Sequence, residues 1–301
     1  MLAALSVIIA TAGFKNLYSC RMPIKNRGIR DAINSGDLDI LFIGSSTFRA
    51  NLDMPMMDEA TGGRAYDVCY GGNHMAAASV QYREIKKRSE NRYSLIAFEM
   101  GPMILTQSAA LSDSRVIWDL SWEGKKELWE IMKKGGVTSL SMMYEYFVTS
   151  GMDDLLTFPV TEPFYATRYY KGAKTDETGS PGKEVLEGEK FDISGEEIVQ
   201  AQADAVRDII RQCRNDGQAF VFIESPVYHR LANDSKYMEC KRVFKQILEE
   251  EGAPFILAEE VDFDNRDPDL FEDMNHMSLK GRREYTGELI KRLSARIDNK
   301  D

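Results

Sequence analysis

Two short stretches near opposite ends of the chain carry residue types suited to nucleophilic catalysis. Gly44-Ser45-Ser46 follows an apolar run, and Asp273 and His276 lie three residues apart near the C-terminus. A serine hydroxyl becomes an effective nucleophile when an imidazole removes its proton and a carboxylate orients that imidazole. The spacing of three can set the acid and the imidazole on one side of a turn. These residues predict a serine-dependent acyl-transfer site built from the two ends of one domain.

The elements that must position these residues follow from the apolar pattern. Short runs rich in β-formers predict buried strands at residues 40–43, 65–70, 94–100, 219–223 and 254–258. Helices are expected at residues 75–87, 121–134, 194–215, 237–251 and 278–298, and Ser194-Gly-Glu-Glu197 predicts a capping box at the start of the third. Strands that alternate with helices indicate βαβ units. We therefore expect a three-layer α/β/α domain with a parallel sheet of about five strands, with Ser46 at its carboxyl edge, where ligands bind.

The middle of the chain departs from this alternation. Residues 106–192 contain a methionine- and aromatic-rich stretch at 139–149 and a glycine- and charge-rich stretch at 171–190. Together they predict an insertion, part lid and part exposed loop, over the carboxyl edge of the sheet. The methionine and aromatic side chains either pack internally or line a substrate groove. The expected organisation is one domain over residues 31–301 that contains this insertion.

Composition narrows the partners and the chemistry. The formal net charge of −10 argues against nucleic acid as a partner, because binding phosphates requires a basic face. Cys20, Cys69, Cys213 and Cys240 form no CxxC pair, so no zinc or redox site is indicated. The last three lie in strand-like or helix-like contexts, and we expect them to be buried free thiols rather than disulfides.

Residues 1–30 have a character of their own. Leu2 to Phe14 is almost wholly apolar and is followed by basic residues, which are Lys15, Arg21, Lys25, Arg27 and Arg30. This apolar run is shorter than the roughly 20 residues that span a bilayer. We interpret the segment as a secretory or membrane-anchoring element, which would place the protein in the cell envelope or outside the cell. The alternative is an amphipathic first helix of a cytoplasmic protein.

Three short motifs together resemble the SGNH (GDSL-like) hydrolase superfamily. They are Gly44-Ser45-Ser46 after the first strand, Gly72-Asn73 after the second, and Asp273-Met-Asn-His-Met-Ser-Leu-Lys-Gly281 before the last helix. The last motif is similar to the D-x-N-H-L-N-x-x-G pattern of the membrane-associated branch. That branch includes the D-alanyl transfer protein of teichoic acid synthesis and the alginate O-acetylation proteins. The resemblance covers about residues 38–105 and 194–298 and leaves the middle unmatched.

The resemblance implies a role for each matched residue. Ser46 would be the nucleophile, His276 the general base and Asp273 its orienting acid, and the backbone N–H groups of Ser46 and Gly72 would form the oxyanion hole. The family's further donor is an asparagine in a GxND motif after the third strand. This chain has Phe98-Glu-Met-Gly101 there, so Asn73 is the candidate substitute.

Several neighbouring polar residues have open roles. Ser45, Arg49 and His74 are candidates for substrate binding, but Ser45 can equally cap a helix, Arg49 can pair with a local carboxylate and His74 can be a polar turn residue. His229 has no evident partner and is expected to be solvated. The acidic stretch 262–269 lacks the spacing of a calcium loop and is interpreted as a solvated loop.

The expected function is that of a serine esterase or O-acyl (acetyl) transferase acting on an acylated cell-envelope or extracellular glycan. The triad chemistry needs no metal and no organic cofactor. Whether water or a sugar hydroxyl accepts the acyl group is left open by the sequence. Two alternatives remain, a non-catalytic glycan- or partner-binding protein on the same scaffold, and a lipase or thioesterase.

Overall fold

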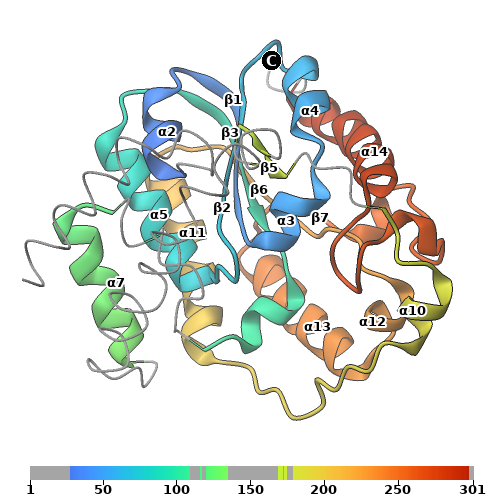
Figure 1. Ribbon diagram of the computed structural model, residues 1–301. Helices are drawn as coiled ribbons and strands as arrows, with labels where there is room; N and C mark the ends of the chain where they lie inside the picture. Colours follow the sequence, from blue (N-terminus) through green and yellow to red (C-terminus); the bar gives the residue numbers. More distant parts are fainter. Residues whose placement is uncertain are drawn as a thin grey trace, which may run out of the picture.

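The computed structural model describes residues 28–108, 116, 120–134, 169–171, 173–174 and 179–297 (Figure 1). The predictions for residues 1–27 and for most of the insertion, including the stretch 139–149, lie outside these ranges. None of the described helices combines the length and the apolar character needed to cross a membrane.

A five-stranded parallel sheet forms the centre of the domain. Its order is β2-β1-β3-β6-β7, and the strands are β1 (Leu38–Gly44), β2 (Ala65–Cys69), β3 (Tyr93–Glu99), β6 (Phe220–Ile223) and β7 (Phe255–Ile256). Ile40 to Gly44 are all buried, as expected of a strand covered on both faces, which is why it reads as a continuous apolar run. The predicted parallel sheet is confirmed.

Helices cover both faces of this sheet, which gives the predicted three layers (Figure 1). One face packs against α2 (Ile29–Asn34), α5 (Met75–Arg88), α11 (Gln200–Asn215) and α13 (Ser235–Glu250). The other packs against α3 (Ser46–Asn51), α4 (Met54–Ala60) and α14 (Leu279–Ile297). Strand β1 contributes to both clusters, because Leu41 and Ile43 face one side and Ile40 and Phe42 the other.

The chain leaves β1 and β2 toward opposite faces. Helices α3 and α4 join β1 to β2 on one face, and α5 joins β2 to β3 on the other. The sheet order therefore reverses at β1, which lies between β2 and β3. The carboxyl end of a strand at such a reversal borders the crevice in which ligands of open α/β sheets bind. Ser46 lies directly at this end.

Shorter elements surround the three layers. The helices are α7 (Trp122–Lys134), α10 (Lys183–Gly188) and α12 (His229–Ala232), with 3-10 turns η1 (Pro102–Thr106), η3 (Ala258–Glu260) and η4 (Pro268–Leu270). The hairpin strands are β4 (Tyr169–Tyr170) and β5 (Ala173–Lys174), and the loop between them borders the sheet edge, because the Lys171 carbonyl accepts a bond of 3.0 Å from the N–H of Asp67 in β2.

The structure differs from the sequence prediction in the start of one helix and in four short helices, and it agrees with the prediction for three cysteines. The capping box at Ser194 is wrong, because the Ser194 N–H and hydroxyl both bond to Asp192 in a turn and α11 begins only at Gln200. The short helices α2, α4, α10 and α12 were not expected, since each is too brief to show a helical period. The three cysteines predicted to be buried free thiols are confirmed, namely Cys69, Cys213 and Cys240.

Candidate active site

Ser46 is the first residue of α3, at a sharp turn after β1. Gly44 closes the strand where no side chain fits, because an added Cβ would lie 2.7 Å from Glu99 Oε2 and 2.8 Å from Phe48 Cδ1. The Ser45 hydroxyl then accepts a hydrogen bond of 3.2 Å from the N–H of Thr47 and caps the helix. The N–H of the first helical residue has no partner within its helix. The turn thus places both the hydroxyl and the N–H of Ser46 at the carboxyl edge of the sheet.

Asp273 and His276 lie in one tight loop that faces Ser46. Oδ1 of Asp273 accepts bonds from the backbone N–H groups of Asn275 and His276, at 2.9 and 2.8 Å. Oδ2 lies 2.7 Å from Nδ1 of His276, and Nε2 of the same ring lies 3.2 Å from Oγ of Ser46. The structure brings together the three residues that the sequence proposed as a triad.

This arrangement is suited to proton transfer from Ser46. When Nδ1 donates its proton to Asp273, the Nε2 lone pair faces the serine hydroxyl. Burial raises the pKa of Asp273, but the hydrogen bond and charge of His276 and the backbone N–H groups outweigh burial and hold that pKa below its usual range. The carboxylate therefore stays ionised beside the ring. The side chains of His276 and Asp273 are 25% and 40% exposed, so the site is open to solvent on one side.

The second strand brings a glycine turn to the same edge. The N–H of Asn73 bonds to the Tyr70 carbonyl at 3.2 Å, and Gly72 within this turn has a φ of 57°, a left-handed conformation that favours glycine. The Tyr70 N–H bonds in turn to the Gly44 carbonyl at 3.1 Å, which ties this turn to the end of β1. Gly72 remains our candidate for the second backbone donor.

The structure does not support Asn73 as an oxyanion donor. Its side chain is 2% exposed, and its Nδ2 donates to the Gly44 carbonyl at 3.0 Å and to Oε1 of Gln81 at 3.1 Å. Gln81 Nε2 donates back to Oδ1 at 3.1 Å, so the amide pair is reciprocal. Both N–H groups of Asn73 are thus used inside the fold. The physical role of Asn73 is to hold the glycine turn against the end of β1.

Two candidate substrate-binding residues are directed inward instead. Ser45 is buried, and besides capping α3 its hydroxyl donates to Glu99 Oε1 at 3.1 Å. His74 is buried at the N-cap of α5, where its Nδ1 accepts a bond of 3.2 Å from the N–H of Ala77. For both residues the capping and turn alternatives of the sequence fit the structure, and the substrate-binding interpretation does not.

Arg49 lies close to a buried carboxyl group. Burial raises the pKa of Asp67 to about 7, although the Cys69 side chain and the positive charge of Arg49 oppose that shift. The positive charge of Arg49 thus acts on the Asp67 carboxyl group, whose two oxygens have no hydrogen-bond partner among the described residues. A contact between Arg49 and an anionic substrate stays a prediction.

Glu99 is the site residue that sequence reasoning missed. It ends β3, is 2% exposed, and its Oε2 accepts a bond of 2.5 Å from the Ser45 N–H. Burial raises the pKa of Glu99 to about 6, against the lowering effects of the Ser45 bonds and the His276 charge. A charged residue at the end of an otherwise apolar strand was the available signal. Both oxygens of Glu99 accept hydrogen bonds from Ser45, so Glu99 is not placed to replace the family's asparagine donor.

Two further expectations concern residues away from the triad. His229 is not simply solvated, because its Nε2 lies 3.2 Å from Oε1 of Glu187 in α10. In the acidic stretch, Asp267 caps η4 and pairs with Lys280 at 3.1 Å. Within the described ranges, no group of His, Cys, Asp and Glu side chains is placed to hold a metal ion.

A separate cavity of about 530 Å³ opens beside the ends of β6 and β7. Its lining includes Glu224 and Lys241, whose side chains form an ion pair at 2.8 Å. None of the three triad residues lines this cavity. It is therefore not the space in which a substrate would meet Ser46.

Comparisons with known proteins find likeness in structure only. No family model and no curated protein matches the chain. A protein from Bacteroides fragilis described as a candidate acylhydrolase is 10% identical, with a TM-score of 0.44 over 89% of this chain and 95% of its own. A GDSL-like lipase from Bacteroides thetaiotaomicron is 8% identical, with a TM-score of 0.41 over 95% and 98%. A catalytic mutant of an acetylxylan esterase from Geobacillus stearothermophilus is 12% identical, with a TM-score of 0.39 over 85% and 94%.

Proposed function

We propose that this chain is a serine esterase or O-acyl transferase of the SGNH type. The observation that carries the proposal is the continuous path from Ser46 Oγ through the His276 ring to Asp273, with separations of 3.2 and 2.7 Å. A carboxylate, an imidazole and a hydroxyl in this order are what nucleophilic acyl transfer requires.

The proposed reaction has two halves. Oγ of Ser46 attacks the ester carbonyl while Nε2 of His276 takes its proton, and the oxyanion that forms faces the N–H groups of Ser46 and Gly72. The C–O bond to the alcohol then breaks, and His276 returns the proton to the leaving oxygen. In the second half, His276 removes a proton from water or from a sugar hydroxyl, whose oxygen attacks the acyl carbon. The bond from that carbon to Oγ of Ser46 then breaks, and His276 returns the proton to Oγ. The products are a carboxylic acid or a new ester.

The substrate class rests on the motif resemblance. The similarity of the segment from Asp273 to Gly281 to the membrane-associated branch supports an acylated glycan of the cell envelope or outside the cell. Two candidate backbone donors without an asparagine donor favour activated esters, because each oxyanion donor contributes about 3 kcal/mol. An acetyl group is what the likeness of this segment to the alginate O-acetylation proteins suggests. Hydrolysis and transfer differ only in the acceptor of the second half.

The test is covalent labelling with a fluorophosphonate probe, which reacts with an activated serine whatever its natural substrate. We expect stoichiometric labelling of the wild type and none of Ser46→Ala. The neighbouring Ser45→Ala is the matched control, and it should still be labelled because Ser45 faces Glu99 rather than His276. Labelling that survives in Ser46→Ala would contradict the assignment of the nucleophile.

One observation favours a second candidate, a non-catalytic binding protein on the same scaffold. The segment Phe98-Glu-Met-Gly101 at the end of β3 contains no asparagine where the family's donor is expected, so the oxyanion site has one donor fewer. A folded wild type that takes up no probe and hydrolyses no acetyl ester would support this candidate. Binding of acetylated oligosaccharides without turnover would then be measured by calorimetry.

A further inference from the structure

One buried side chain joins the helix of Ser46 to the loop of His276. Asn51 is the last residue of α3 and is 0% exposed. Its Nδ2 donates to the carbonyl of Asn275 at 3.1 Å, and its Oδ1 accepts from the N–H of Met277 at 2.8 Å. These two backbone groups flank His276 in the sequence. A single amide therefore holds the chain on both sides of the general base.

A second contact links the same two segments. Nδ2 of Asn275 donates to Oγ1 of Thr47 at 2.9 Å. Thr47 and Asn51 are four residues apart in α3 and therefore share one face of the helix. Helix α3 thus presents the nucleophile at its first position and two anchors for the His276 loop along one side.

These contacts matter because Asp273 cannot set the distance between His276 and Ser46. The carboxylate of Asp273 belongs to the same loop as His276, so its bonds fix the tautomer and the ring orientation within the loop. If the whole loop shifted, those bonds would move with it. The separation of 3.2 Å between Nε2 and Oγ depends on contacts between the loop and its surroundings. Tyr228 holds the loop at the Met274 carbonyl, and the contacts to α3 hold it on both sides of His276.

We propose that Asn51 is a positioning residue that holds His276 at reacting distance from Ser46. Its catalytic consequence rests on the proposed function, but its effect on the ring does not. The Asn51 amide bonds to the carbonyl of Asn275 and to the N–H of Met277, two groups that a neighbouring β-strand would otherwise bond. Truncation leaves both backbone groups without partners, and the loop then gains freedom to move. Displacement of a catalytic group by about 1 Å costs on the order of 100-fold in rate.

The first readout is the rate of probe labelling at Ser46. For Asn51→Ala we expect the maximal labelling rate to fall by about 100-fold, with the half-saturating probe concentration unchanged. Asn91→Ala is the matched control. Its Nδ2 also bonds to backbone carbonyls, those of Ile33 at 2.7 Å and Ala32 at 3.4 Å, but at the opposite edge of the sheet. It should label within about twofold of the wild type.

The second readout is independent of activity. The chain has 3 histidines, so nitrogen NMR can follow His276 after assignment with a His276→Ala variant. In the wild type we expect the neutral ring to carry its proton on Nδ1. In Asn51→Ala we expect the proton to stay on Nδ1, because Asp273 moves with the loop, and the Nε2 signal to shift toward that of a nitrogen without a hydrogen bond to Ser46, which a merely stabilising residue would not cause.

The combined outcomes separate this inference from the proposed function. In a His276→Ala background, Asn51→Ala should cause no further loss of labelling, because Asn51 acts through the ring. If Asn51→Ala does not fold, Asn51→Ser, which retains one hydroxyl, takes its place and should show a smaller loss. A folded variant with wild-type labelling and wild-type His276 signals would overturn the inference. An unlabelled wild type whose His276 signals still depend on Asn51 would overturn the proposed function alone.

Discussion

The carboxylate of Asp273 makes two kinds of contact, and one substitution separates them. Asp273→Asn retains an oxygen for the backbone N–H groups of Asn275 and His276, which fix the loop. The new amide nitrogen, however, faces Nδ1 of His276 as a donor, which forces the ring proton onto Nε2. The ring can then no longer accept the proton of Ser46.

We expect Asp273→Asn to fold normally and to lose about 1,000- to 10,000-fold in kcat for acetyl ester hydrolysis, as a wrong tautomer does in other triads. Steady-state kinetics with a chromogenic acetate ester would measure this loss. A variant that retains a tenth of the wild-type kcat would show that Asp273 does not orient the base.

Glu99 provides a pH test at the same scale. Its folded pKa of about 6 lies above the ordinary 4.5, so the folded state binds the proton more tightly than the unfolded state does. The protonated Glu99 side chain contributes its full stabilisation below its unfolded pKa, and this stabilisation is lost as the pH rises through about 6. Since one pKa unit corresponds to about 1.4 kcal/mol, the ionised group costs about 2 kcal/mol.

Glu99→Gln keeps an oxygen to accept the Ser45 N–H and removes the buried charge. We compare the unfolding free energy of this variant with that of the wild type at each pH. The variant should gain about 1 kcal/mol relative to the wild type from about pH 5 to about pH 8, because only the wild type loses stability as Glu99 ionises. Urea unfolding at the two pH values measures the difference. An equal difference at both would mean that Glu99 does not titrate in this range in the folded state.

Among elements, the start of α14 explains the glycine that ends the C-terminal motif. A Cβ on Gly281 would lie 2.0 Å from the carbonyl oxygen of Leu270, a backbone atom that cannot turn away. The same carbonyl accepts a bond of 3.0 Å from the N–H of Ser278, which follows the His276 loop closely. Close packing of helix against loop thus requires a glycine at this position.

Gly281→Ala should therefore destabilise the fold by about 3 kcal/mol or more, because overpacking displaces backbone. Gly287→Ala in the same helix is the control, since its Cβ would meet only Met56 Cε at 3.8 Å. We expect that control to be neutral or stabilising by up to about 1 kcal/mol. Urea unfolding of both variants decides the question, and equal effects would contradict the packing account.

The elements also show where sequence patterns were sufficient. Apolar runs at 40–43 and 219–223 predicted β1 and β6 closely, because buried parallel strands are apolar on both faces. The capping box at Ser194 failed because Asp192, two residues earlier, captures the same groups in a turn. Local motifs compete, and the winner depends on neighbours that the pattern does not include.

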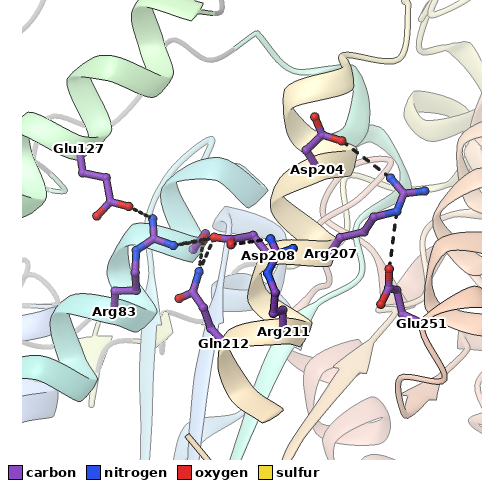
Figure 2. Close-up of polar contacts among 9 residues, drawn as sticks. Arg83, Glu127, Asp204, Arg207, Asp208, Arg211, Gln212 and Glu251 are labelled. Atoms are coloured by element: carbon purple, nitrogen blue, oxygen red, sulfur yellow. Dashed lines mark hydrogen bonds and ion pairs between the residues drawn. The ribbon is translucent and has the colours of Figure 1, made fainter. Parts of the chain in front are cut away.

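At the scale of the molecule, an ionic network joins three helices on one face of the sheet (Figure 2). Arg83 of α5 pairs with Glu127 of α7 and, at 2.6 Å, with Asp208 of α11. Asp208 also accepts bonds from Ser79 at 2.8 Å and from Arg211 at 3.0 Å. Burial raises the pKa of Asp208, but these partners outweigh burial and lower that pKa below its usual range. The ionised carboxylate therefore stabilises the fold above the unfolded pKa of Asp208, and this stabilisation is lost as the pH falls through the folded pKa.

We expect Asp208→Ala to lower the free energy of unfolding by about 1–2 kcal/mol, with a smaller effect at high salt because part of the gain is electrostatic. Asp204→Ala is the matched control in the same helix. Its carboxylate is exposed and lies 3.9 Å from Arg207, so we expect a change below about 0.5 kcal/mol. Equal losses in the two variants, measured by urea unfolding, would contradict a central role for Asp208.

The whole fold also explains which site residues could be found from the sequence. Ser46, Asp273 and His276 were found because their residue types and motifs carry the chemistry, and the sheet topology then brought the two chain ends together. The direction of a side chain is decided by tertiary contacts that a sequence pattern does not contain. For that reason Asn73 and His74, both suited to a site, turned out to support the fold, as did Ser45.

The central claim is that Ser46 carries the acyl group during the reaction. The most direct measurement is rapid acid quenching of the wild type with an excess of chromogenic acetate ester, followed by peptide mapping by mass spectrometry. We expect one acetyl group on the peptide that contains Ser46 in the wild type, and none on that peptide in His276→Ala or in Ser46→Ala. Ester turnover with no acetylated Ser46 peptide, or with the acetyl group on another residue, would contradict the role of Ser46 as the nucleophile.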